Sequence, residues 1–177
     1  MNDLEEHVIL VDRSDAELGV MGKMEAHQQG VLHRAFSVFL FDDNGRLLLQ
    51  QRALTKYHTP GLWTNTCCSH PRPGEALFDA AHRRLQEEMG IVNVALRYAF
   101  PYYYEARLSP ELIEHELDHV LVGCWQQTPE FNPVEVNAIR WAEQAELDLS
   151  ILEQPNQYTP WFKGLTKKVH AFWTQTL

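Results

Sequence analysis

The pattern of apolar and polar positions predicts a chain that alternates between strands and helices. Short apolar or alternating runs bounded by turn residues are typical of strands, and they occupy residues 7–11, 35–41, 46–51, 99–106, 116–125 and 134–141. The sequence Asp-Asp-Asn-Gly at 42–45 separates two of these runs, so we expect a tight hairpin turn there. Prolines and a glycine interrupt residues 56–73, which predicts a loop with one short extended piece.

The clearest helical pattern covers residues 75–89. Its apolar side chains recur every four positions and form one stripe, at Leu77, Ala81 and Leu85. Gly90 follows directly and is typical of a residue that ends a helix in the left-handed conformation. Two further helices are expected, at 142–152 and 161–173. This mixture predicts an α/β (α+β) fold in which a mixed β-sheet sandwich is flanked by helices.

The length and the apolar content fit one hydrophobic core. The chain has 177 residues, of which 45% are hydrophobic, so a single domain spanning 1–177 is expected. A chain of this size buries roughly 70% of the surface that its unfolded form exposes. It therefore needs neither disulfides nor a structural metal to fold, and any metal it binds is expected to serve catalysis.

Composition also narrows the compartment and the partners. The first residues are acidic and no apolar segment is long enough for a secretion or membrane signal, so we expect a cytoplasmic protein without a membrane partner. The odd number of cysteines, with Cys67 and Cys68 adjacent, indicates reduced thiols. A net charge of −9 disfavours a nucleic-acid partner, although a few local cations could still bind a small anion.

The first candidate for chemistry is Cys68-Ser69-His70. In an extended segment, residues two apart share a face, so Cys68 and His70 should point one way and Cys67 the other. A thiol near an imidazole or a metal becomes a better acid or nucleophile. From spacing alone, a buried cysteine beside a structural histidine is an equally good interpretation.

Glu114 and Glu116 form the second candidate. On a strand they share a face about 7 Å apart, which suits a divalent cation and leaves one carboxylate as a possible general base. Asp118 continues the same face, and a solvated strand edge is the alternative interpretation. With His27 and His33 upstream, three histidines and two glutamates would suit Mn²⁺, Zn²⁺ or Fe²⁺ better than Mg²⁺.

Charged and aromatic residues supply a possible phosphate site. Glu88 could hold Mg²⁺ on phosphate oxygens, although Arg84 and Glu88 are four apart and could equally form a surface ion pair. The cations available for a phosphate are Lys23, Arg52, Lys56 and Arg84. Trp161 could stabilise a cation over its ring or could simply pack in the core.

Several stretches, in order along most of the chain, resemble type I isopentenyl diphosphate isomerase, an offshoot of the Nudix fold. They are L-H-R-A-F-S at 32–37, Q-R-A-L-T-K at 51–56, P-G-L-W-T-N at 60–65, T-N-T-C-C-S-H-P at 64–71, Glu75, R-R-L-Q-E-E-M-G at 83–90, E-H-E at 114–116 and T-P-W at 159–161. The combination is highly specific, whereas no single element is. The resemblance implies a Nudix-like sandwich and conversion of isopentenyl diphosphate to dimethylallyl diphosphate through a carbocation-like intermediate, in isoprenoid biosynthesis.

The resemblance also assigns roles to individual residues. Cys68 and Glu116 match the two catalytic acid/base groups, and Tyr104 matches a supporting tyrosine. The ligands implied for a Mn²⁺ or Zn²⁺ ion are His27, His33, His70, Glu114 and Glu116. Glu88 and the Cys68 carbonyl match the groups that hold Mg²⁺ on the diphosphate. The residues implied to bind the substrate are Lys23, Arg52, Lys56 and Arg84 at the diphosphate, with Trp161 over the carbon skeleton.

Two departures separate the chain from the Nudix hydrolase pattern. Ser69 stands where the Nudix box begins with glycine, and Arg84 stands where it has a metal-binding glutamate. Loss of that carboxylate argues against a diphosphate hydrolase, which remains the alternative function. A metal-binding module without catalysis is a third possibility, because the chain has nine histidines. The expected partner is a small-molecule diphosphate, and the expected oligomeric state is a monomer.

Overall fold

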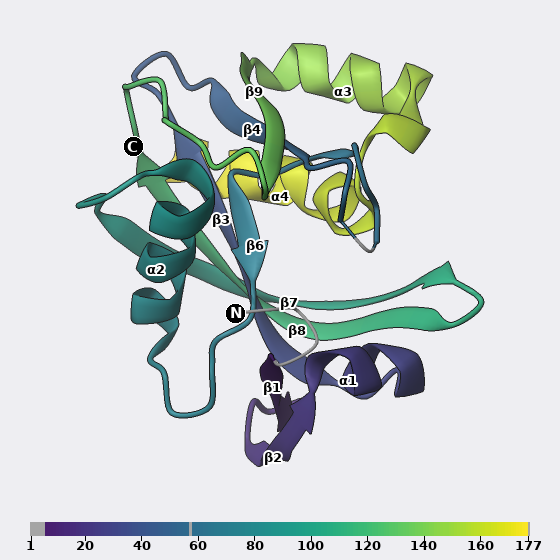
Figure 1. Cartoon of the computed structure of the whole chain (residues 1–177). Helices are drawn as coiled ribbons and strands as arrows, with labels where there is room; N and C mark the ends of the chain where they lie inside the picture. Colours follow the sequence, from purple (N-terminus) through teal and green to yellow (C-terminus); the bar gives the residue numbers. More distant parts are fainter. Residues whose placement is uncertain (1–5, 57, 177) are drawn as a thin grey trace.

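The computed structural model describes residues 6–56 and 58–176, and it contains every strand and helix expected from the sequence. The strands within these residues are β1 (His7–Val11), β2 (Glu17–Gly22), β3 (His33–Phe41), β4 (Leu47–Arg52), β5 (Trp63–Thr64), β6 (Cys67–Ser69), β7 (Leu96–Ser109), β8 (Leu112–Cys124) and β9 (Val136–Ala142). The helices are α1 (Lys23–Gln29), α2 (Leu77–Met89), α3 (Gln144–Glu153) and α4 (Pro160–Gln175), with a short 3₁₀ turn at Pro155–Gln157. Figure 1 shows their arrangement.

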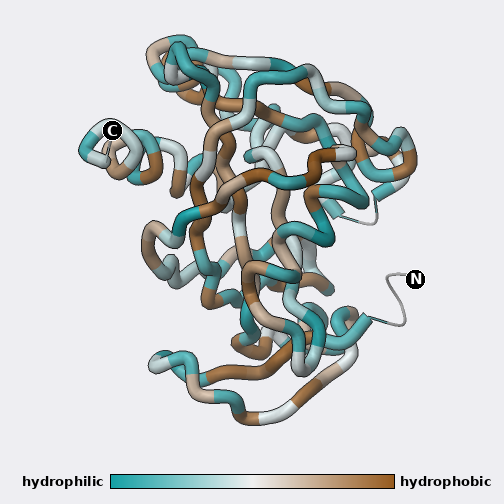
Figure 2. Tube along the Cα trace, turned by 90° about the vertical axis from the view of Figure 1, so that its left-hand side faces the viewer, coloured by the Kyte–Doolittle hydropathy of each residue, from teal (hydrophilic) through white to brown (hydrophobic). Residues whose placement is uncertain are grey.

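Strand β3 lies at the centre of the sheet and is buried on both faces. It pairs in parallel with β8 and antiparallel with β6. Its even-numbered residues, such as Val38, join the core beneath α2, whereas odd-numbered residues, such as Phe39, join the core beneath α4. Helices therefore cover the two faces of the sheet, and apolar residues run through the central strands in Figure 2. The mixed sheet flanked by helices confirms the expected fold class.

Strands β3 and β4 separate soon after the turn that joins them. Asp42 accepts hydrogen bonds from the backbone N–H groups of residues 44 and 46, which confirms the expected hairpin turn. The two strands pair at Phe41 and Leu47, after which β4 continues beside β9 and β5. The side chain of Asn65 then donates to the Val38 carbonyl, 3.1 Å away. The segment 63–69 thus bridges the diverging strands and places Cys67 and Cys68 against β3.

Strands β7 and β8 form a hairpin that is longer than the expected ranges 99–106 and 116–125. Their pairing runs from Leu96 opposite Gly123 to Ser109 opposite Leu112. The outer part of this hairpin projects beyond the rest of the sheet as an arm (Figure 1). The sequence pattern predicted only the inner part of the hairpin, where β8 crosses the core and is most apolar. Polar positions interrupt the apolar pattern in the arm.

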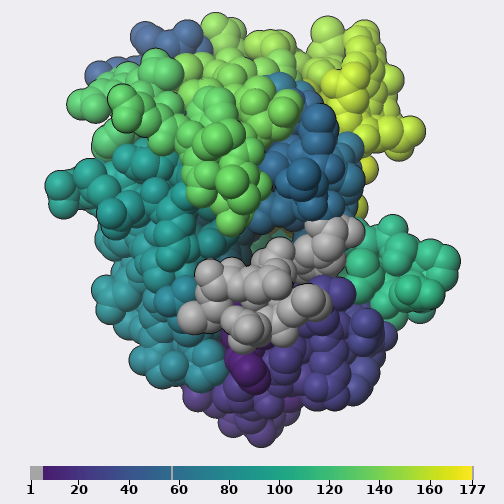
Figure 3. Space-filling view, viewed as in Figure 1, coloured from purple at the N-terminus to yellow at the C-terminus, as the bar shows by residue number. Residues whose placement is uncertain are grey.

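Strand β2 and helix α1 were not expected from the sequence. Strand β1 pairs with β2 and reaches the central sheet at Leu10 opposite His33. Ile9 and Val11 pack with Leu117 of β8 in a small apolar cluster. Figure 3 shows these N-terminal elements beside the arm formed by β7 and β8. Within the described residues, no helix has the length and apolar character needed to cross a membrane.

Candidate active site

A pocket opens between the central strand β3, helix α2 and helix α4. Its lining includes Lys23, Ala35, Phe36, Ser37, Arg52, Lys56, His58, Cys68, Ser69, His70, Arg84, Glu88, Glu114, Glu116 and Trp161. Most of the residues selected from the sequence are in this set, and His27, His33 and Tyr104 contact members of it. The fold therefore brings every candidate site residue together, although they come from eight different helices and strands and from the loops that follow β4 and β6.

The two adjacent cysteines point to opposite faces of β6. Cys67 lies opposite Val38 and is fully buried in the core beneath α2. Cys68 lies opposite Ser37 and faces the pocket. Burial raises the pKa of the Cys68 thiol well above its ordinary value, although the nearby Arg52 charge opposes this. The thiol of Cys68 therefore carries its proton at neutral pH and is available as a proton donor.

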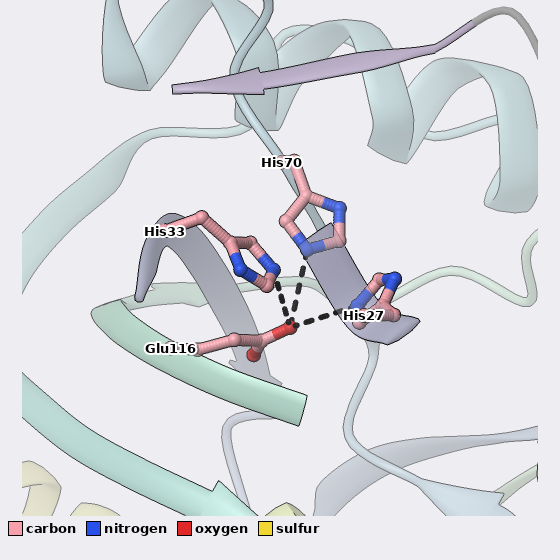
Figure 4. Close-up of side chains that lie close together, drawn as sticks. All are labelled: His27, His33, His70 and Glu116. Carbon is pink, nitrogen blue, oxygen red and sulfur yellow. Dashed lines mark hydrogen bonds and ion pairs between the residues drawn. The ribbon is translucent and has the colours of Figure 1, made fainter. Parts of the chain in front are cut away.

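Three histidines and one glutamate converge beside the pocket, as Figure 4 shows. The ligand atoms of His27, His33, His70 and Glu116 all lie within 4.8 Å of one another. One Glu116 oxygen is 4.0, 3.6 and 3.1 Å from the Nε2 atoms of His27, His33 and His70, in that order. The parallel register of β3 and β8 places His33 directly beside Glu116.

The chemistry of this group fits a divalent cation. The Nδ1–H of His33 donates to the Val31 carbonyl at 2.8 Å, so its Nε2 carries a lone pair. Among the described residues, this buried Nε2 has no hydrogen-bond partner, yet it faces the Glu116 oxygen. Lone pairs facing each other in a buried site repel unless a cation or proton lies between them. Imidazoles with one carboxylate suit Mn²⁺ or Zn²⁺.

Glu114 lies outside this four-residue group in the structure. It is 3% exposed, accepts a hydrogen bond from the Tyr104 hydroxyl at 3.2 Å and lies 3.6 Å from Nδ1 of His58. Burial and the charge of Glu116 raise the pKa of Glu114 well above its ordinary value. Burial also raises the pKa of Glu116, but contacts with His27, His33 and His70 outweigh it and hold that pKa well below its ordinary value. The pKa values of two neighbouring carboxyl groups are thus shifted in opposite directions.

The cationic side of the pocket is paired with acidic residues. Arg84 binds Glu88 at 2.5 Å and Glu87 at 2.7 Å, and the Glu88 side chain is only 7% exposed. The interpretation of Arg84 and Glu88 as a surface ion pair is therefore wrong, because Glu135 and the pocket wall enclose them. Lys56 also contacts Glu135. Glu88 and Glu135 thus compensate the positive charges of Arg84 and Lys56 in this buried wall, and the wall stays polar.

Trp161 forms the wall of the pocket that α4 contributes. It is 4% exposed, and its indole N–H donates to the Asn65 side chain at 3.2 Å. The guanidinium carbon of Arg52 lies 5.7 Å from the centre of the Trp161 ring. The ring therefore packs in the core, as one interpretation of the sequence expects, and it also borders the pocket; stabilisation of a substrate cation over the ring stays a prediction.

Two residues, one lining the pocket and one bonded to a residue that lines it, were not selected from the sequence. His58 lines the pocket beside Glu114, and burial together with the Arg52 charge lowers the pKa of His58 to about 2. Asp118 accepts a hydrogen bond from Ser37 at 2.7 Å and is 2% exposed. The alternation of Glu114, Glu116 and Asp118 along one strand was the signal that could have identified Asp118 as buried.

Comparisons with known proteins agree with this geometry. Residues 31–162 match the family model described as the NUDIX domain. An isopentenyl-diphosphate Delta-isomerase of Burkholderia multivorans is 52% identical over 165 residues, which cover 93% of this chain and 93% of the relative. Isopentenyl-diphosphate Delta-isomerase 2 of Photorhabdus laumondii is 50% identical over 92% of this chain and 91% of the relative.

Solved structures share the fold at low sequence identity. A protein from Deinococcus radiodurans superposes with a TM-score of 0.78 at 19% identity and covers 92% of this chain and 98% of its own. A MutT Nudix hydrolase from Burkholderia pseudomallei superposes with a TM-score of 0.62 at 18% identity, covering 78% of this chain and 98% of its own. These structures support the fold alone, and the relatives of high identity show which family within that fold the chain belongs to. The chain therefore belongs to the Nudix-fold family of isopentenyl-diphosphate Delta-isomerases.

Proposed function

We propose that this protein isomerises isopentenyl diphosphate to dimethylallyl diphosphate in isoprenoid biosynthesis. The observation that carries this proposal is a thiol and a carboxyl group in one buried pocket. Strands β6 and β8 lie on either side of β3, so Cys68 and Glu116 enter the pocket from opposite sides of its floor. The reaction needs two groups in such positions, because one proton is added to the terminal methylene carbon and another leaves C2.

The residues of the pocket fit the chemistry of this proton transfer. An unactivated alkene is a weak base, so its protonation requires a strong acid held in a dry site. Burial raises the pKa of the Cys68 thiol and of the Glu114 carboxyl group, so both groups tend to keep their protons but are weak acids on their own. A divalent cation held by the three histidines and Glu116 would polarise the neighbouring Glu114 carboxyl group and increase its acidity. The ring of Trp161 would stabilise positive charge on the tertiary carbon.

The diphosphate has a matching cationic wall. Lys23, Arg52, Lys56 and Arg84 all line the pocket. We propose that they bind the diphosphate, and that Glu88 with the Cys68 carbonyl holds Mg²⁺ on its oxygens. Glu88 has the chemistry for this role, since it is buried and accepts hydrogen bonds from Gln50 and Arg84 at 2.8 and 2.5 Å. Substrate phosphates commonly complete the octahedral shell of Mg²⁺.

A Nudix-type diphosphate hydrolase is less well supported. A hydrolase needs carboxylates to hold metal beside the phosphate, whereas Arg84 occupies one such position and neutralises Glu87 and Glu88. Incubation with isopentenyl diphosphate and Mg²⁺, followed by proton and phosphorus NMR, separates the functions. Formation of the dimethylallyl isomer with both phosphates retained is expected. Release of phosphate or pyrophosphate without isomer would indicate a hydrolase, and tight metal retention without turnover would indicate a metal-binding module.

The remaining expectations from the sequence stay predictions. They are a single domain over 1–177, a monomeric state, a cytoplasmic location, Mg²⁺ at the diphosphate and Mn²⁺ or Zn²⁺ in the histidine group. The shared cores beneath α2 and α4 support one domain, because elements from both halves of the chain contribute to each. Metal analysis and sedimentation of the purified protein would test the metal and the oligomeric state.

A further inference from the structure

Strand β8 has two faces with different tasks. One face carries Glu114 and Glu116 into the pocket. The other face carries Ile113, His115, Leu117 and His119, and all four contact the N-terminal elements. The strand that supplies the carboxylates therefore also supports the segment that contains Lys23 and His27.

The contact between His115 and Gly30 is the most specific of these. Nδ1 of His115 lies 2.9 Å from the Gly30 carbonyl oxygen, which can only accept, so Nδ1 carries the proton. Nε2 then accepts from the hydroxyl group of Tyr103. Both ring nitrogens have partners, and these partners fix the tautomer and the orientation of the ring.

Gly30 is the residue at which α1 ends. Its φ of 65° is left-handed, and its N–H donates to the Ala26 carbonyl. A Cβ atom at this position would lie 3.2 Å from the side chain of Ile113. Ile113 and His115 flank Glu114 on the opposite face of β8, and together they fix where the C-terminal end of α1 lies.

Helix α1 depends on such contacts. It has seven residues, Lys23–Gln29, and no side chain caps its N-terminus. An isolated helix of this length is unstable in water, so tertiary contacts must set its position. His27 lies in its last turn, three residues before Gly30, and its Nε2 is 4.0 Å from Glu116.

We propose that His115 is a positioning residue, which holds the end of α1 so that His27 stays in the metal-binding group. The hydrogen bond from His115 Nδ1 to the Gly30 carbonyl fixes the C-terminal end of α1 relative to β8. The inference rests on the proposed function in taking His27 as a metal ligand. Its test uses metal binding and helix protection, which need no turnover, so a failure of the isomerase assay leaves the test intact.

The test replaces His115 with residues that differ in one donor. His115→Phe removes the donor and keeps an aromatic ring, and His115→Gln moves the donor towards the Nε2 position. His115→Asn keeps an amide N–H near the position of Nδ1. His82→Phe is the matched control, because Nε2 of His82 in α2 makes the same kind of bond, at 2.9 Å, to the Val94 carbonyl in the loop that follows α2.

Two measurements are made on each full-length variant: Mn²⁺ affinity by titration, and hydrogen exchange of the α1 amides. We expect His115→Phe and His115→Gln to weaken Mn²⁺ binding by about 10- to 100-fold, as loss of supporting partners does at other metal sites, and to speed exchange in α1. His115→Asn should restore both to within about threefold of wild type, and His82→Phe should leave both unchanged.

Three results would overturn the proposal. They are wild-type Mn²⁺ affinity in both His115→Phe and His115→Gln, an equal loss in the His82→Phe control, or no restoration by His115→Asn. Failure of His115→Phe to fold leaves the comparison of the glutamine and asparagine variants, which decides the question by itself. A wild-type protein that binds no Mn²⁺ would refute both the metal group and this inference.

Discussion

Replacing each of the two adjacent cysteines with alanine should separate stability from catalysis. Cys67 is fully buried beneath α2, whereas Cys68 faces the pocket. The two side chains follow one another on β6 but lie on opposite faces of the sheet. We therefore expect Cys67→Ala to lower stability with turnover retained, and Cys68→Ala to lower turnover by about 10²-fold or more with the fold retained.

The structure sets the size of both effects. Cys67→Ala removes one sulfur from a fully packed core, which resembles the loss of a buried methyl group and costs about 1 kcal/mol in the free energy of unfolding. For a chain of this length, that loss lowers the melting temperature by about 2–4 °C. Cys68→Ala removes an acid/base group, and such groups contribute about 10²- to 10⁴-fold to rate, or about 3–5 kcal/mol of barrier.

The assay compares both variants with wild type by calorimetry and by formation of dimethylallyl diphosphate at saturating substrate. Cys68→Ala should melt near the wild-type temperature because its side chain borders the pocket. A Cys68→Ala variant with more than a tenth of wild-type turnover would refute the assignment of Cys68. Equal losses of turnover in Cys67→Ala and Cys68→Ala would refute the argument from the two faces of β6.

Other substitutions test the core and the diphosphate site. Ser37→Ala leaves the buried Asp118 carboxyl group without its partner and should lower the free energy of unfolding by about 1–3 kcal/mol in urea denaturation; an unchanged midpoint would contradict this. Gly90→Ala should destabilise more than Gly45→Ala, because both have positive φ but only at Gly90 would a Cβ meet a backbone oxygen, at 2.5 Å; equal melting temperatures would refute the clash. Glu88→Gln should raise the Mg²⁺ concentration for half-maximal turnover by about tenfold, and an unchanged Mg²⁺ dependence would exclude Glu88 as a ligand.

The alternation of side chains along strands could be predicted from the sequence, because it depends on neighbouring residues alone. The opposite orientations of Cys67 and Cys68 follow from it, and so does the shared face of Glu114 and Glu116. The meeting of His33 with Glu116 could not be predicted in this way. It requires the parallel register of β3 and β8, which joins residues 83 positions apart.

Helix α1 shows the same dependence on distant contacts. Its sequence, K-M-E-A-H-Q-Q, has no apolar stripe that would predict a helix. Its position depends on β8, through His115 and Ile113 at the residue where it ends. The four-residue spacing of Arg84 and Glu88 likewise could not predict that the pair is buried, because Glu135 from a distant segment encloses it. The resemblance to a known family predicted that these segments contribute to one site, which residue spacing alone could not predict.

Isomerisation in deuterium oxide tests the central claim most directly. If acid/base groups of the protein add a proton at one carbon and remove another at C2, the new methyl group must carry hydrogen that has exchanged with solvent. Mass spectrometry and deuterium NMR of the dimethylallyl diphosphate formed in deuterium oxide should therefore show at least one deuterium in that methyl group at every turnover, with the diphosphate intact. Isomer that contains no solvent deuterium would contradict the account, because hydrogen would then have moved directly between the two carbons.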